Sequence, residues 1–280
     1  QKMRALIIYL VISAVFIGCT PILSIDASTQ NVYHFSDTDK NISLLDISET
    51  FGTYDGSFVL YDNNLDSWKI YDLEEATKRI PPESTYKIYD ALLGLESGII
   101  TPEHSSMTWN GDAFPFPSWE ADQDLNSAMQ NSVNWYFQAI DSQLGINRVQ
   151  EFLNKIEYGN QTTSSNLDLY WSDFSLKISP LEQVTLLKKF NTNEFHLNFQ
   201  NVFSVKNAIK IASTPNGNFY GKTGTGRVNG QDINGWFIGY VETSDNSYYF
   251  ATNIQSDSNA TGKKAFEITS DILKKLHIWN

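Results

Sequence analysis

The chain has 280 residues, of which 41% are hydrophobic and 14% aromatic, so it can bury a sizeable core. Its formal net charge of −12 argues against nucleic acid as a partner, because a phosphate-binding surface needs a basic stripe. One cysteine and four scattered histidines argue against a disulfide framework and against a metal site.

The N-terminal segment differs from the rest of the chain. Residues 5–25 form an almost uninterrupted apolar run, and about 20 such residues match the thickness of a bilayer core. Lys2 and Arg4 precede the run and Asp26 follows it. The positive-inside rule therefore predicts a transmembrane helix over residues 1–25, with the remainder of the chain outside the cell.

A signal peptide is the alternative interpretation of this run. If Met3 were the start, Cys19 would resemble the lipidated residue of a secreted lipoprotein. The length of the run, which continues past Cys19, favours the membrane helix. The polar residues 26–48 predict a linker, and we expect the folded domain to occupy residues 49–280.

Further along the chain, apolar residues recur at strand spacing and then at helical spacing. Two short runs, 56–61 and 68–71, flank a turn-like segment and predict a β-hairpin. A helical region interrupted by polar loops is expected over 84–190.

The C-terminal part predicts strands followed by a helix. Three strands are expected over 219–225, 236–241 and 248–254, and a helix over 262–276. Strands, a helical insertion, strands and a closing helix predict an α+β fold, with one antiparallel sheet and helices on its faces.

The most informative short motif is Ser84-Thr85-Tyr86-Lys87, which opens an apolar, helix-like run. Positions i and i+3 lie on one face of a helix, so the Ser84 hydroxyl and the Lys87 amine can meet. A serine is a weak nucleophile until a base takes its proton. A lysine can be that base only if burial lowers its pKa or its nitrogen is chemically changed. Taken alone, a helix cap followed by a solvated lysine explains the motif more simply.

Four further sequence elements favour a functional interpretation of this motif. Each has an ordinary structural explanation: a helix cap, a turn, a core tryptophan and a strand end. Their occurrence together and in this order is difficult to attribute to chance. They are Ser132-Val133-Asn134, Tyr158-Gly159-Asn160, Trp171 and Lys222-Thr223-Gly224.

With these residues in place, the sequence resembles the penicillin-recognising serine enzymes. Within them it is similar to the class D β-lactamases and, more closely, to the sensor domain of the BlaR1/MecR1 β-lactam receptors. The similarity runs from about Gly56 to the C-terminus and includes the tracts 82–90, 131–137 and 235–241. It implies a serine β-lactamase/penicillin-binding-protein-like fold with a helical subdomain.

The resemblance implies that Ser84 attacks a β-lactam carbonyl and becomes an acyl-serine. It implies that Lys87 takes up carbon dioxide to form N-carboxylysine, an anion that can act as general base, with the Trp171 indole N–H as its partner. Ser132 would relay a proton to the leaving lactam nitrogen.

The remaining roles concern substrate binding. Lys222 and Thr223, with Gly224, would bind the substrate carboxylate, and the backbone N–H groups of Ser84 and Thr225 would form the oxyanion hole. Tyr158 and Asn160 would shape the edge of the pocket. The family's carboxylate-binding arginine has no clear counterpart, since the nearest cations are Lys263 and Lys264.

Asn134 bears on the choice between enzyme and receptor. The class D β-lactamases carry an apolar residue at this position, whereas the receptors carry a polar one. An amide beside the carbamate would destabilise it, so that the acyl-serine persists. The resemblance therefore predicts a sensor acylated at Ser84 by penicillins and cephalosporins, which would induce expression of antibiotic-resistance genes. A class D β-lactamase and, less favoured, a cell-wall transpeptidase remain alternatives.

The resemblance also implies partners outside this sequence. In the family, the last transmembrane helix leads into an extracellular sensor, and a cytoplasm-facing zinc-protease domain with a His-Glu-x-x-His motif lies upstream. This motif is absent from the 280 residues. We expect the chain to be the membrane-anchored sensor part of such a receptor, with no metal of its own.

Overall fold

The computed structural model describes residues 41–280. The predicted membrane helix, the alternative lipidation site at Cys19 and most of the predicted linker lie outside the described residues. Within 41–280, no helix has both the length and the apolar character needed to cross a bilayer.

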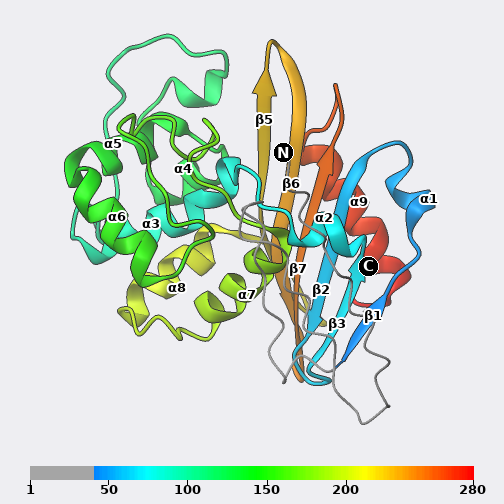
Figure 1. Ribbon diagram of the computed structural model, residues 1–280. Helices are drawn as coiled ribbons and strands as arrows, with labels where there is room; N and C mark the ends of the chain where they lie inside the picture. Colours follow the sequence, from blue (N-terminus) through cyan, green and yellow to red (C-terminus); the bar gives the residue numbers. More distant parts are fainter. Residues whose placement is uncertain (1–40) are drawn as a thin grey trace, which may run out of the picture.

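A seven-stranded sheet, in the order β1-β3-β2-β7-β6-β5-β4, forms the centre of the described part (Figure 1). The predicted hairpin is confirmed as β2 and β3, and the three predicted C-terminal strands are confirmed as β5, β6 and β7. The strands are β1 (Ile42–Leu44), β2 (Asp55–Asp62), β3 (Ser67–Tyr71), β4 (Lys210–Thr214), β5 (Gly217–Val228), β6 (Gln231–Glu242) and β7 (Ser247–Gln255).

The short strand β1 corrects two expectations from the sequence. It pairs with β3 in parallel, so the sheet is not wholly antiparallel. It also lies inside the segment 26–48 that was predicted as a linker. All three of its residues are exposed and the strand is too short to show a periodic pattern, so backbone hydrogen bonds hold it in place. The N–H of Trp68 donates to the carbonyl of Asn41 at 2.7 Å.

Helices cover the sheet and form a separate helical region beside β5 (Figure 1). The predicted C-terminal helix is confirmed as α9, which packs against β5, β6 and β7. The helices are α1 (Ser48–Phe51), α2 (Leu73–Thr77), α3 (Lys87–Glu96), α4 (Leu125–Gln130), α5 (Asn134–Leu144), α6 (Ile146–Lys155), α7 (Pro180–Asn191), α8 (Phe199–Ala208) and α9 (Gly262–Lys275), with 3-10 turns η2 (Glu83–Tyr86) and η3 (Pro117–Trp119).

The sheet separates two hydrophobic cores. Side chains alternate along β6: Trp236 and Ile238 belong to the core shared with the helical region, whereas Phe237 belongs to the core under α9. Both faces of the central strands are therefore buried. For the site, the sheet therefore provides a rigid platform, and the turn η2 packs against its strand β5.

Candidate active site

The candidate nucleophile lies where η2 runs directly into α3. Ser84 is in the 3-10 turn and Lys87 is the first residue of α3, so the two side chains lie on one face. The Lys87 Nζ is 2.7 Å from the Ser84 Oγ. Glu83, just before the serine, adopts a left-handed backbone with φ of 52°, and its N–H donates to the Trp171 carbonyl at 3.0 Å.

Lys87 is completely buried and has three polar neighbours. Its Nζ lies 2.7 Å from the Ser84 Oγ, 3.2 Å from the Ser132 Oγ and 2.6 Å from the Asn134 Oδ1. Burial and, next, the positive charge of Lys222 hold the pKa of Lys87 well below its usual value. The amide oxygen can only accept, whereas a hydroxyl can donate. A neutral Lys87 amine can thus donate to Asn134 and still accept the proton of Ser84.

Ser132 connects Lys87 to the strand β5. It lies between α4 and α5 with a φ of 52°, which turns its side chain into the site. Its Oγ is 3.2 Å from the Lys87 Nζ and 3.1 Å from the Lys222 Nζ. Burial lowers the pKa of Lys222 to about 7. The contacts form a continuous path for a proton from Ser84 through Lys87 and Ser132 to Lys222.

The outer edge of β5 faces this path. β4 pairs with β5 only as far as Tyr220, so within the described residues no strand covers the edge from Lys222 to Thr225. Glycines at this edge of β5 allow the turn η2 to approach closely. A Cβ at Gly224 would lie 3.2 Å from the Ser84 nitrogen, and one at Gly226 would lie 2.5 Å from the Glu83 Oε1.

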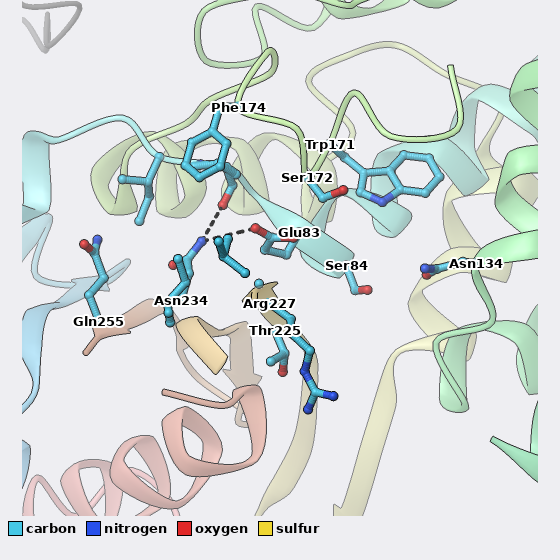
Figure 2. A pocket seen from close by; sticks show the side chains of 15 residues that line it. Glu83, Ser84, Asn134, Trp171, Ser172, Phe174, Thr225, Arg227, Asn234 and Gln255 are labelled. Atoms are coloured by element: carbon cyan, nitrogen blue, oxygen red, sulfur yellow. Dashed lines mark hydrogen bonds between the residues drawn. The ribbon is translucent and has the colours of Figure 1, made fainter. Parts of the chain in front are cut away.

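Two cavities meet at Ser84, and Figure 2 shows the first of them. One, of about 260 Å³, extends past Trp171 and Phe174 towards Gln255. The other, of about 340 Å³, is bordered by Phe116 and Trp119, whose ring centroids are 5.1 Å apart. Ser84, Asn134 and Thr225 line both cavities, so a ligand bound over Ser84 can extend to either side.

Trp171 lies in the wall of the site. It is 3% exposed, and the Lys87 Nζ is 5.8 Å from the centroid of its ring. Phe137 lies at a comparable distance, 5.6 Å, from the same nitrogen. The amine of Lys87 is therefore enclosed by aromatic rings except where it meets the three polar groups.

Tyr158 and Asn160, predicted to shape the pocket edge, line neither cavity that contains Ser84. Tyr158 is fully buried and packs edge-on against Tyr86, beneath the nucleophile turn. Asn160 donates to the Ser175 carbonyl at 2.8 Å and accepts from the Lys177 N–H at 2.9 Å. Tyr158 is held by ring packing and Asn160 by backbone contacts, so the two residues support the loop behind the site rather than the pocket wall.

The cations that the sequence suggested for carboxylate binding also lie elsewhere. Lys264 is 3.6 Å from Glu267 on α9, and neither Lys263 nor Lys264 lines the two cavities. A cation that sequence reasoning missed, Arg227, lines the first cavity (Figure 2). Its Nε is 2.8 Å from the Asp232 Oδ1, so this guanidinium already has a partner.

Sequence reasoning also missed the polar floor of the first cavity. Glu83 is 6% exposed, and the Asn234 Nδ2 lies 3.5 Å from its Oε1 and 3.1 Å from the Pro81 carbonyl oxygen. Burial raises the pKa of Glu83 to about 8. No spacing in the sequence connects residues 83 and 234. The only local signal is the proximity of Glu83 to Ser84.

The fold and this constellation define a class of protein. Residues 56–274 match the family described as the penicillin binding protein transpeptidase domain, and the chain belongs to this family. Solved class D β-lactamases share the fold, among them one from Bacillus subtilis at 36% identity and a TM-score of 0.79. That match covers 84% of this chain and 97% of the other.

Within this class the chain belongs to the BlaR1/MecR1 sensor domains. It is 46% identical to the solved C-terminal domain of the Bacillus licheniformis BlaR penicillin-receptor, with a TM-score of 0.83, over 86% of this chain and 98% of that one. It is 45% identical to the regulatory protein BlaR1 of the same organism, over 98% of this chain and 45% of the relative. The methicillin resistance protein MecR1 of Staphylococcus aureus is 38% identical, over 99% and 47%. The chain spans about half the length of these curated relatives.

Proposed function

We propose that this chain senses β-lactams by forming a long-lived acyl-serine at Ser84. The observation that carries the proposal is the position of the Lys87 Nζ, 2.7 Å from the Ser84 Oγ and 2.6 Å from the Asn134 Oδ1. The first contact activates the Ser84 hydroxyl, and in the second the amide oxygen of Asn134 binds the same lysine nitrogen. Sequence similarity to proteins named as a penicillin-receptor and a methicillin resistance protein supports the choice of ligand.

The acylation step follows from these contacts. The Ser84 Oγ attacks the lactam carbonyl carbon, a new C–O bond forms, and the lactam C–N bond breaks. The Oγ proton passes to Lys87 and reaches the leaving nitrogen through Ser132. The backbone N–H groups of Ser84 and Thr225 bind the developing oxyanion. Lys222 and Thr223, on the uncovered edge of β5, hold the substrate carboxylate.

Carbon dioxide on Lys87 fits the same site. A neutral, buried amine enclosed by Phe137 and Trp171 meets the requirement for carbamate formation. As a carbamate, Lys87 would supply an anionic base, with the Trp171 indole as the neighbouring donor. Asn134 acts against this state because its amide oxygen binds the unmodified amine. Without the carbamate, Lys87 lacks the anionic base that would activate water after acylation, and the acyl-serine persists.

We propose the following organisation for the longer receptor. Residues 1–25 are a transmembrane helix, residues 26–40 lead out of it, and the domain lies outside the cell, where β-lactams are present. Acylation is passed to a zinc-protease domain encoded upstream, and resistance genes are induced. Intact cells that exclude a membrane-impermeant penicillin from Ser84 would contradict this orientation. A His-Glu-x-x-His motif and several apolar helices encoded upstream would support the arrangement.

The experiment is a titration of the chain with a fluorescent penicillin, followed by intact-mass measurement and nitrocefin turnover. We expect one adduct per chain on Ser84, a single burst of nitrocefin opening and no adduct on the control Ser84→Ala. Sustained hydrolysis would identify a class D β-lactamase. Exchange of D-Ala-D-Ala peptides would identify a transpeptidase.

A further inference from the structure

Two buried carboxyl groups lie beneath Lys87, on the helices that form the site. Asp90 follows Lys87 by three residues, as Lys87 follows Ser84, so each is the neighbour of the next along η2 and α3. Asp141 is on α5, the helix that begins at Asn134 and packs against α3. Both aspartates are 0% exposed. α3 and α5 are thus linked by the contact between Lys87 and Asn134, and each helix contributes one of the two buried carboxyls.

These carboxyls have too few partners for two negative charges. Among the described residues, Asp141 accepts one hydrogen bond, from the Tyr170 hydroxyl at 3.0 Å. Neither oxygen of Asp90 has a partner of normal geometry, nor does the Asp141 Oδ1. An ionised carboxylate that is buried without partners is unstable, and two such charges side by side repel. One proton between the pair removes both difficulties.

The groups that face the pair agree with this arrangement. The Tyr86 and Tyr170 rings enclose it, and burial raises the pKa of both phenols well above the usual value, so neither supplies charge. Burial and the charge of Asp141 raise the pKa of Asp90 well above its usual value. Burial raises that of Asp141 too, whereas the hydrogen bond from Tyr170 lowers it. The two carboxyls therefore hold one proton and one negative charge between them.

The pKa of Lys87 is affected by the negative charge of the aspartate pair and by the positive charge of Lys222. Lys222 lowers the pKa of Lys87, whereas Asp90 and, more weakly, Glu83 act in the opposite sense. The single charge of the pair therefore opposes the effect of Lys222. If the aspartate pair lost its charge, the pKa of Lys87 would fall, and Lys87 would lose its proton at a lower pH. Asp168, an exposed acid near Asp141, is the other carboxylate that acts on the pair.

We propose that Asp90 and Asp141 share one proton and, through their single negative charge, set the pH range in which Lys87 can activate Ser84. They are positioning residues, because they act through Lys87 and touch neither ligand nor reacting atoms. The inference rests on the proposed function, since the rate that it governs is acylation of Ser84.

The test is the pH profile of the acylation rate of the full chain with a fluorescent penicillin. The double variant Asp90→Asn/Asp141→Asn keeps the shape of both side chains but cannot ionise. Its acidic limb is expected to move to lower pH by about one unit, the effect of removing one charge within a helix turn. Each single variant retains one carboxyl that can carry the charge, so its limb should move less. In the control Asp168→Asn the limb should stay in place. A double variant with an unmoved limb overturns the proposal.

A second measurement covers the case in which the double variant does not fold. A shared proton predicts an infrared band of a protonated carboxyl that persists above pH 8, where Glu83 has lost its proton. The band should be lost in Asp90→Asn and remain in Glu83→Gln. Absence of this band from the unchanged chain overturns the proposal. The proposed function fails if mass measurement finds no adduct on Ser84. The inference fails separately, if the adduct forms but neither the acidic limb of the pH profile nor the infrared band changes in the variants.

Discussion

The buried carboxyl of Glu83 makes the stability of the fold depend on pH. In the folded chain its pKa is raised from the usual 4.5 to about 8, and the cause is burial. Between these values the folded state holds a proton that the unfolded state has lost. Stability therefore decreases as pH rises from about 4.5 to about 8. The decrease amounts to about 3 kcal/mol at pH 7 and about 5 kcal/mol above pH 8.

Glu83→Gln tests this reasoning, because glutamine has the shape of the protonated acid and does not ionise. We expect the variant to be as stable as the unchanged chain near pH 4.5 and more stable by about 3 kcal/mol at pH 7. Urea unfolding at half-unit steps between pH 4.5 and 8.5 measures the difference. The difference curve isolates Glu83 from the other buried groups, since these titrate in both proteins.

An exposed glutamate provides the control. Glu74→Gln, on the surface of α2, should follow the unchanged chain at every pH. If the free energies of unfolding of Glu83→Gln and of the unchanged chain run parallel from pH 4.5 to 8.5, the reasoning is refuted. They would mean that Glu83 is ionised in the folded state, stabilised by its contact with Asn234.

Three other substitutions examine separate parts of the site. Asn134→Leu removes the hydrogen bond to Lys87 and should convert the nitrocefin burst into turnover at least about tenfold faster; an unchanged burst would contradict the role of Asn134. Lys222 loses its charge as pH rises through about 7, so carboxylate binding should weaken above that pH, seen as a rise in the saturation constant for acylation. In Lys222→Arg, whose side chain stays charged, this rise should disappear. Gly159→Ala should destabilise the fold by about 1–3 kcal/mol in urea, because φ is +47° and the added Cβ would collide with the Lys177 carbonyl; unchanged stability would show that the loop can move.

Local patterns in the sequence predicted the regular elements well. The alternation in 56–61 and 68–71 predicted the hairpin, and helical spacing over 262–276 predicted α9, which ends at Lys275. β4 was missed because its five residues are mostly exposed and carry no alternation of burial. Its place depends on pairing with β5, which is a property of the tertiary structure.

The site was predictable only where residues are close in sequence or match a family motif. The structure brings Ser84, Lys87, Ser132 and Lys222 together in one chain of contacts. The burial of Glu83 could not be predicted, because it depends on a left-handed backbone at a non-glycine residue and on glycines in β5. The partnership of Asp90 with a residue on another helix likewise has no spacing in the sequence.

The edge of β5 that no strand covers within the described residues has a further consequence. An uncovered strand edge is a template on which another chain can pair, and such pairing leads to aggregation. The register of β5 against β6 shifts between Gly226 and Arg227, and such a bulge twists a strand away from straight pairing. Lys222 places a buried cation at the same edge. The edge can therefore remain open to a small ligand while discouraging the addition of a second protein strand.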